Sequence, residues 1–279
     1  PVYTNNEDAD TVEVDYTRAA IKWTPGDDFE AVLTYMSQEG EYGGRRQTTS
    51  GPDGWGEYYG EYEIGAVINE ASSNESEFTS LEMTYDLGFA TLSSSTSFYE
   101  RTYEGTSDNT GFFASKGWLY WYGYGLMTRP AIAAERQNSE EAFVQEVRLV
   151  SNGDQQFDWT MGVFYMDQEA SAAQQTRARG FQEWWAAASG PAPYQGFLAE
   201  PPYSYIGLYY DPTTNITFDW THEREFKDFA LFGEVTWDLS ETLSATVGAR
   251  YFDNKDKVTS QTSFPIWYLS NPVVTDTNK

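Results

Sequence analysis

The chain has 279 residues, with 17 lysines and arginines against 43 aspartates and glutamates, one histidine and no cysteine. A formal net charge of −26 excludes nucleic acid as a partner, because phosphate neutralisation needs clustered basic side chains. The lack of cysteine excludes disulfides, thiolate catalysis and cysteine metal sites, and no apolar run is long enough for a transmembrane helix.

Eight segments that alternate apolar and polar residues follow one another along the chain. We predict them as strands over residues 11–24, 28–38, 76–86, 89–104, 141–151, 156–170, 224–238 and 242–256. Short polar turns join them into hairpins, whereas the links between hairpins run to tens of residues. Many segments reach the roughly 9 to 11 residues that a tilted strand needs to cross a bilayer. This pattern of short turns and long loops is typical of an outer-membrane β-barrel.

The last predicted hairpin shows the alternation most clearly. Its first strand places Leu231, Val235 and Trp237 on one face, and its second strand continues that face with Leu243 and Val247. The residues between them are mostly small or polar. We predict that the apolar face contacts lipid and that the other face lines a barrel lumen.

Two further groups of residues favour a membrane barrel over a soluble all-β fold, which alternation alone leaves open. Aromatic residues flank the short turns, where an interfacial girdle would lie: Trp23, Phe29, Tyr85, Phe89, Phe157 and Trp237. The lumen face is expected to carry charges of both signs, which suit water or an internal plug: Arg18, Lys22, Glu30, Glu82, Glu146, Arg148, Glu234 and Arg250.

The long links are rich in tryptophan and tyrosine, unlike disordered segments. Such rings either pack together above the barrel or line a vestibule in which they stack on an apolar or sugar-like ligand. The candidate ligand-binding residues are Trp118, Tyr120, Trp121, Tyr122, Trp184, Trp185, Tyr203, Tyr205 and Tyr209. The first link is also acidic, but it has no spaced ligand motif, which favours a solvated acidic surface over a Ca²⁺ site.

The sequence predicts no catalytic site, no cofactor and no metal site. Its single histidine, His222, lies in a polar segment, DWTHERE, and is interpreted as a surface residue rather than half of a catalytic dyad. The carboxylates are numerous, but no pair stands out by spacing as an acid and a base. We therefore expect that the protein is not an enzyme.

Several segments resemble the barrel of TonB-dependent outer-membrane receptors of Gram-negative bacteria. The resemblance lies in EAFVQEVRLVSN, FDWTMGVFYMDQE and DFALFGEVTWDLSETLSATVGARYFDNK, and YTRAAIKWTPGDDFEAVLTYMSQ and MTYDLGFATLSSSTSFYER are similar to earlier hairpins. It implies that residues 1–279 are the central part of a plugged antiparallel barrel of about 22 strands. The plug, its TonB-contacting box and the C-terminal strands are expected outside the chain, and the TDTNK tail is expected in an extracellular loop.

The resemblance also implies a function, which is active, TonB-dependent uptake of a scarce nutrient across the outer membrane. The expected partners are outer-membrane lipid and lipopolysaccharide, TonB through the plug region, and a small-molecule or oligosaccharide ligand. The aromatic links favour a neutral oligosaccharide or aromatic compound, while a metal chelate stays open because of Arg45, Arg46, Lys116, Arg129, Arg136, Arg177 and Arg179. A passive porin or structural barrel and a soluble secreted adhesin or lectin are the alternatives.

Overall fold

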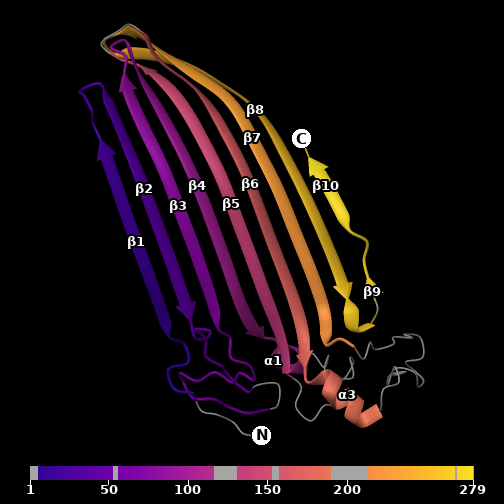
Figure 1. Ribbon diagram of the computed structural model, residues 1–279. Coiled ribbons are helices and arrows are strands. Elements are labelled where there is room, and N and C mark those ends of the chain that lie inside the picture. The colour runs from indigo at the N-terminus through magenta and orange to yellow at the C-terminus, as the bar shows by residue number, and fades with distance from the viewer. Residues whose placement is uncertain are drawn as a thin grey trace.

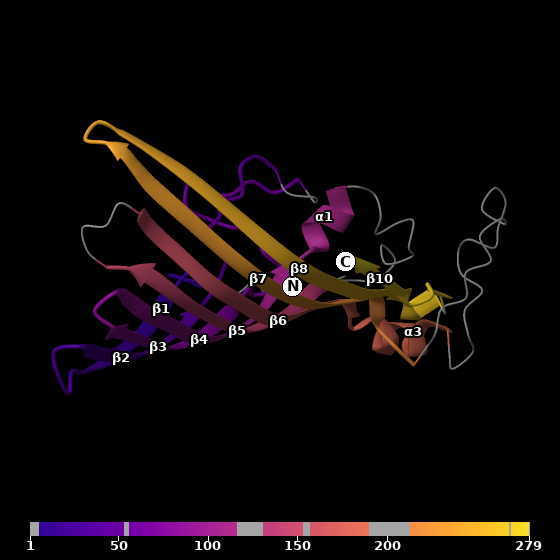
Figure 2. The same cartoon turned by 90° about the horizontal axis from the view of Figure 1, so that it is seen from above.

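A computed structural model of the chain describes residues 6–52, 56–115, 131–152, 157–189, 213–267 and 269–278 (Figure 1). These residues form one curved antiparallel sheet in which the strands lie side by side in chain order, except that β10 pairs with β8 and β9 lies off the main path (Figures 1 and 2). The predicted all-β antiparallel fold is therefore confirmed. The strands are β1 Val12–Trp23, β2 Phe29–Tyr42, β3 Ser72–Asp86, β4 Ala90–Asp108, β5 Ala131–Ser151, β6 Phe157–Arg179, β7 Ile216–Ser240, β8 Leu243–Phe264, β9 Leu269–Ser270 and β10 Val274–Asn278.

The two ends of the sheet differ in how the strands are connected. Short turns join the strands at one end, and the long links that follow Tyr42, Asp108 and Arg179 begin at the other, the loop end (Figure 1). Three helices, α1 Thr110–Ser115, α3 Phe181–Ser189 and the 3-10 helix η3 Pro265–Trp267, also lie at the loop end. None of the helices in the described part of the chain is long and apolar enough to cross a membrane.

The short turns have the chemistry that chain reversal needs. In the turn between β3 and β4, Gly88 has a φ of 84°, which residues with a Cβ rarely adopt. The carboxylate of Asp86 accepts a hydrogen bond from the Gly88 N–H at 2.8 Å and from the Asn152 side chain at 2.8 Å. One aspartate therefore ties this turn to the neighbouring β5–β6 turn.

Several strands extend further toward the loop end than the sequence predicted. β5 begins at Ala131 instead of residue 141, β6 ends at Arg179 instead of residue 170, and β7 begins at Ile216 instead of residue 224. The extensions of β5 and β6 are rich in alanine and polar residues and lack a clear hydrophobic period, whereas the β7 extension alternates Ile216, Phe218 and Trp220 on its inner face. The prediction that the TDTNK tail lies in a loop is wrong, because Val274–Asn278 pairs with β8.

The strand register separates the sheet into two faces. On the outer face, Leu231 lies opposite Val163 and Tyr251, and Val235 lies opposite Val247. Val247 is 76% exposed, and no second layer of described residues covers this row. The alternate side chains form the inner face, where small residues such as Thr34, Ser80, Ala142 and Ala230 are buried between larger neighbours. The apolar row therefore lines the outside of a curved sheet and not the core of a soluble sandwich.

The outer face divides sharply into an apolar band and a charged zone. On β6, the alternate residues from Phe157 to Tyr165 are all apolar or aromatic, and Asp167 and Glu169 follow them toward the loop end. The span from Phe157 to Tyr165 is about 26 Å along the strand at roughly 3.3 Å per residue. Because barrel strands tilt by about 35–45°, this stretch covers roughly 20 Å of height, close to the apolar band of about 25 Å that outer-membrane barrels carry between two aromatic girdles.

The predicted girdle at the short-turn end is present as a chain of ring contacts. The Trp23 and Phe29 ring centroids lie 5.5 Å apart, and those of Phe29 and Tyr85 lie 6.3 Å apart. Further along the same edge, Phe157 and Trp237 stack at 5.4 Å. At the opposite edge of the band, the outer face carries Tyr35, Phe143, Tyr165, Phe229 and Tyr251.

Candidate functional site

Most of the predicted ligand-binding residues lie outside the described residues. Trp184 and Trp185 belong to α3, and only the side chain of Trp184 is described. The residues outside the described ranges are Trp118, Tyr120, Trp121, Tyr122, Tyr203, Tyr205 and Tyr209. Their role in ligand binding stays a prediction.

Helix α3 is anchored to the end of β6 by its first turn. Gly180, with a φ of 76°, reverses the chain after the strand, and its carbonyl accepts the Trp184 N–H at 3.1 Å. Phe181 is only 2% exposed, and its ring lies 5.9 Å from the Trp184 ring. The geometry of Trp184 is that of a ring packed within the loop end, one of the two roles expected for such residues.

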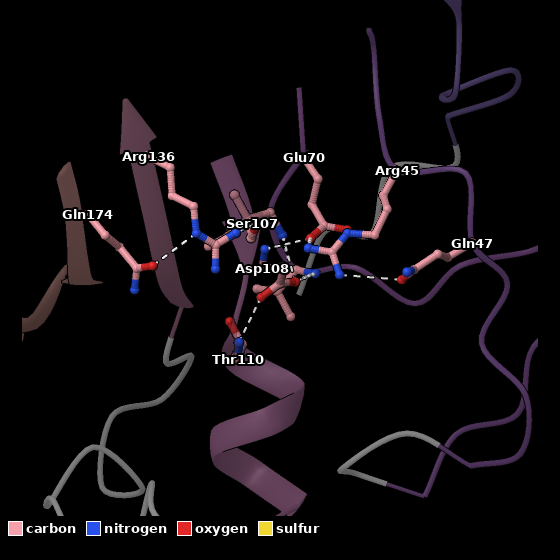
Figure 3. Close-up of polar contacts among 10 residues, drawn as sticks. Arg45, Gln47, Glu70, Ser107, Asp108, Thr110, Arg136 and Gln174 are labelled. Atoms are coloured by element: carbon pink, nitrogen blue, oxygen red, sulfur yellow. Dashed lines mark hydrogen bonds and ion pairs between the residues drawn. The ribbon is translucent and has the colours of Figure 1, made fainter. Parts of the chain in front are cut away.

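The first two links are joined by a part-buried polar network around Asp108 (Figure 3). The Asp108 carboxylate accepts hydrogen bonds from three backbone N–H groups, those of Val67 at 2.5 Å, Ile68 at 3.1 Å and Thr110 at 2.9 Å. Its own N–H donates to Glu70 at 2.8 Å. A carboxylate with several backbone donors is strongly held in place. Asp108 therefore fixes the end of the first link to the start of the second.

Further contacts surround this network and tie it to the sheet. Glu70, whose side chain is 5% exposed, pairs with Arg45 at 2.7 Å. Thr110 is fully buried, and its hydroxyl accepts the Ile132 N–H of β5 at 2.9 Å. Beside it, Arg136 donates to Ser107 and Gln174, both at 2.9 Å (Figure 3). The loop end thus has a rigid polar base although its links are long.

The inner face carries the predicted charges of both signs, and several of them are paired within the sheet. Lys22 and Glu30 form an ion pair at 2.7 Å, and Arg148 pairs with Glu146. The Arg250 guanidinium lies 5.6 Å from the Phe164 ring centroid. These contacts hold charges in fixed positions on the lumen side of the band.

The Phe232 ring organises the arginines at mid-height of the inner face. The guanidinium groups of Arg148 and Arg250 each lie 5.9 Å from its centroid. The ring occupies the space above Gly162, where the Cβ of any other residue would collide with it. A glycine in β6 therefore lets the phenylalanine of β7 lie flat enough to contact both cations.

A broad hollow of about 1040 Å³ lies at the loop end, lined by residues from β1 to β7. Most of its strand residues have side chains on the outer face, so this hollow is not the lumen-side vestibule that the sequence predicted. Carboxylates outnumber cations in its lining, and they include Glu13, Glu41, Glu104 and Glu135. No group of three acidic or histidine side chains in the described part of the chain is arranged to hold a metal ion.

His222 lies on the inner face, which sequence reasoning did not anticipate. Its ring stacks on Trp220 with centroids 5.7 Å apart and an interplanar angle of 18°. Two residues further along β7, Arg224 makes two hydrogen bonds to Asp256, at 2.9 and 3.0 Å. The bonds from Arg224 hold the pKa of Asp256 below its ordinary value, and the same pair raises the pKa of Arg224. The alternation of β7 is the sequence signal that could have placed these side chains together.

No protein-family model matches the chain, and no curated protein matches it by sequence. Its fold matches the crystal structure of the ferric yersiniabactin uptake receptor FyuA from Yersinia pestis, with a TM-score of 0.60 over 96% of this chain and 11% identity. The chain has the fold of part of a TonB-dependent receptor barrel. It spans 34% of the FyuA chain. The siderophore receptor PiuA from Acinetobacter baumannii gives a TM-score of 0.42 at 10% identity, over 92% of this chain and 42% of that chain.

Proposed function

We propose that the chain forms part of the wall of an outer-membrane receptor that imports a scarce nutrient by TonB-dependent active transport. In this proposal a plug domain and further barrel strands belong to the same full-length protein. The fold likeness to FyuA over 96% of the chain supports the barrel assignment. The expected activity is transport and not catalysis.

The outer-face band is the observation that carries the membrane part of the proposal. An apolar surface with exposed side chains such as Val247 and Leu231 is costly in water and favourable in lipid. Aromatic residues bound it on both sides, as at the two interfaces of a bilayer. Above the band the outer face is polar and would contact lipopolysaccharide.

The inner face favours a lumen that is filled by a plug domain rather than an open pore. Arg148 and Arg250 are fixed by Phe232, Phe164 and neighbouring carboxylates at the level of the band. Fixed charges of both signs can pair with complementary charges on a plug domain. This arrangement favours a gated receptor, whereas a passive porin needs no such partner.

The aromatic links and the fold relative support a range of ligand classes. Tryptophan and tyrosine stack on flat or sugar-like molecules, which supports an oligosaccharide or an aromatic compound. FyuA is a receptor for a ferric chelate, which adds a metal chelate to the range. Trp121 and Trp184 are the loop residues whose replacement tests ligand contact.

The test is uptake by cells that carry the full-length gene, with and without TonB. We expect the protein in the outer-membrane fraction and uptake of its nutrient only in cells with TonB. Uptake that continues without TonB would make the protein a passive pore. Recovery of the protein from the soluble fraction without detergent would remove it from the membrane altogether.

A further inference from the structure

Three polar side chains interrupt the apolar band on the outer face of β4 and β5. They are Ser94 and Thr96 on β4 and Gln145 on β5, which we call the polar triad. The register pairs Thr96 with Gln145 and places Ser94 opposite Val147. The next outer-face residues along the two strands are apolar in both directions: Leu92 and Leu149 toward the short turns, Phe98 and Phe143 toward the loop end. The triad therefore lies within the band and not at either edge.

The strands on either side of the triad keep the band apolar at the same height. On β3, the residues opposite the β4 members of the triad are Leu81 and Met83. On β6, Val163 and Tyr165 continue the apolar surface beside Gln145. The triad is thus an isolated polar cluster. Contact with lipid does not explain it, because lipid favours apolar side chains at all three positions.

Hydrogen bonds within the triad hold its polar groups in place. The Thr96 hydroxyl donates to Gln145 Oε1 at 2.5 Å, and Gln145 Nε2 donates to Ser94 Oγ at 3.0 Å and to the Glu146 carbonyl at 3.2 Å. No residue in the described part of the chain accepts a hydrogen bond from the Ser94 hydroxyl. The triad therefore leaves one donor and several lone pairs for a partner beyond the sheet.

A second protein wall suits the triad better than lipid does. Hydrocarbon offers no hydrogen bonds, so polar groups that face it cost free energy, which contact with another transmembrane element recovers. Serine, threonine and glutamine form hydrogen bonds of this kind between packed transmembrane segments. Ser94 and Thr96 are also small, so another wall can approach the backbone closely between the exposed side chains of Leu92 and Phe98.

The triad is self-complementary, which favours a second copy of the same protein as the partner. It contains donors and acceptors without formal charge, so two triads can pair with each other. Copies of one protein enter a membrane in the same orientation, so the triads of two neighbours lie at the same depth. A two-fold axis perpendicular to the membrane then brings β4 and β5 of one copy against those of the other, as an isologous interface requires.

The glutamates above the band limit the height of such a contact. Glu100 and Glu141 lie opposite each other on the outer face, one step beyond Phe98 and Phe143 toward the loop end. In a dimer they would approach the same pair of the other copy, and like charges repel. Water and ions screen this repulsion at the membrane surface. The contact is therefore confined to the apolar band and the triad within it.

We propose that the outer face of β4 and β5 is the contact surface of a homodimer in the outer membrane. The polar triads of the two copies hydrogen-bond across the two-fold axis, and the apolar side chains around them pack together. This inference rests on the proposed function, because it needs the outer face to lie in a bilayer. It also goes beyond that function, since a monomeric receptor would satisfy it equally well.

The first test is disulfide cross-linking of the full-length protein, freed of any other cysteine, in isolated outer membranes. The 279 residues contain no cysteine, so Val147→Cys introduces a thiol beside the triad and leaves the triad intact. Oxidation with copper phenanthroline should link this variant into dimers. The matched control is Val247→Cys, whose position is 76% exposed against 38% for Val147 but lies three strands away on β8. The control should stay largely monomeric, although random collisions would link it at least as readily.

The second test replaces the triad itself and follows energy transfer between labelled copies in phospholipid vesicles. Gln145→Leu completes the apolar band and should preserve TonB-dependent uptake, but it should weaken the dimer about threefold or more, as expected for lost hydrogen bonds between transmembrane segments. Val235→Leu on β7 is the control and should leave the dimer unchanged.

Four results would overturn the inference: equal cross-linking of Val147→Cys and Val247→Cys, a link from Val147→Cys to a different protein, no dimer in either assay, or a dimer that Gln145→Leu leaves unchanged. A protein that stays monomeric and still supports TonB-dependent uptake would refute the dimer, and the proposed function would stand.

Discussion

An arginine placed on the outer face at mid-height of the band distinguishes a lipid-facing wall from a water-facing one. Val247 lies on β8 midway between Leu243 and Tyr251, which mark the two edges of the band. Each edge is about 13 Å away along the strand at roughly 3.3 Å per residue. Val247→Arg should therefore cost about 2 to 4 kcal/mol of barrel stability in a bilayer.

The same substitution in water would cost almost nothing. Val247 is 76% exposed, and substitutions at exposed positions usually change stability by less than about 0.5 kcal/mol. The neighbouring Thr246→Arg is the matched control, because it points into the lumen. Its hydroxyl shares a hydrogen bond with Thr236 at 2.9 Å, and losing that bond costs about 0.5 to 1.5 kcal/mol.

The measurement is guanidinium unfolding of the full-length protein in phospholipid vesicles, followed by tryptophan fluorescence. We expect the Val247→Arg variant to lose at least about 0.5 kcal/mol more than Thr246→Arg, the smallest difference between the two ranges above. If both variants unfold at the same guanidinium concentration, the row through Val247 does not face lipid. The assignment of outer and inner faces would then have to be abandoned.

Three further predictions concern the loop end. Asp108→Ala removes the acceptor of three backbone N–H groups, so hydrogen exchange at Ile68 and Thr110 should accelerate about tenfold or more, whereas Asp253→Asn on the outer face should leave it unchanged. Glu141→Gln relieves repulsion from the glutamates on both neighbouring strands and should raise stability by about 0.2 to 1 kcal/mol, with the gain shrinking in high salt. The lowered pKa of Asp256 means that its pairing with Arg224 stabilises the fold above the ordinary value of 3.8 and is lost as pH falls through the lowered pKa. Proton NMR of the Arg224 side chain should follow that loss, and Asp256→Asn should remove the pH dependence.

The sequence was sufficient to predict the strands and faces of the half of the sheet that is expected to face lipid. Hydrophobic alternation is strict there because every second side chain meets hydrocarbon, so the β7–β8 hairpin and its two faces could be read directly from Leu231, Val235 and Val247. The short turns were equally readable, since Gly88 and Asp86 carry turn chemistry within a few residues. Local signals of this kind do not depend on distant partners.

The loop half of the sheet could not be predicted in the same way. Beyond the band, the outer face becomes charged, and residues such as Glu169 and Glu223 end the apolar row that marks a lipid-facing strand. The row that runs from Tyr103 through Asn138 and Ala172 to His222 depends on three strand registers at once. A single sequence contains no direct measure of register between strands joined by links of tens of residues.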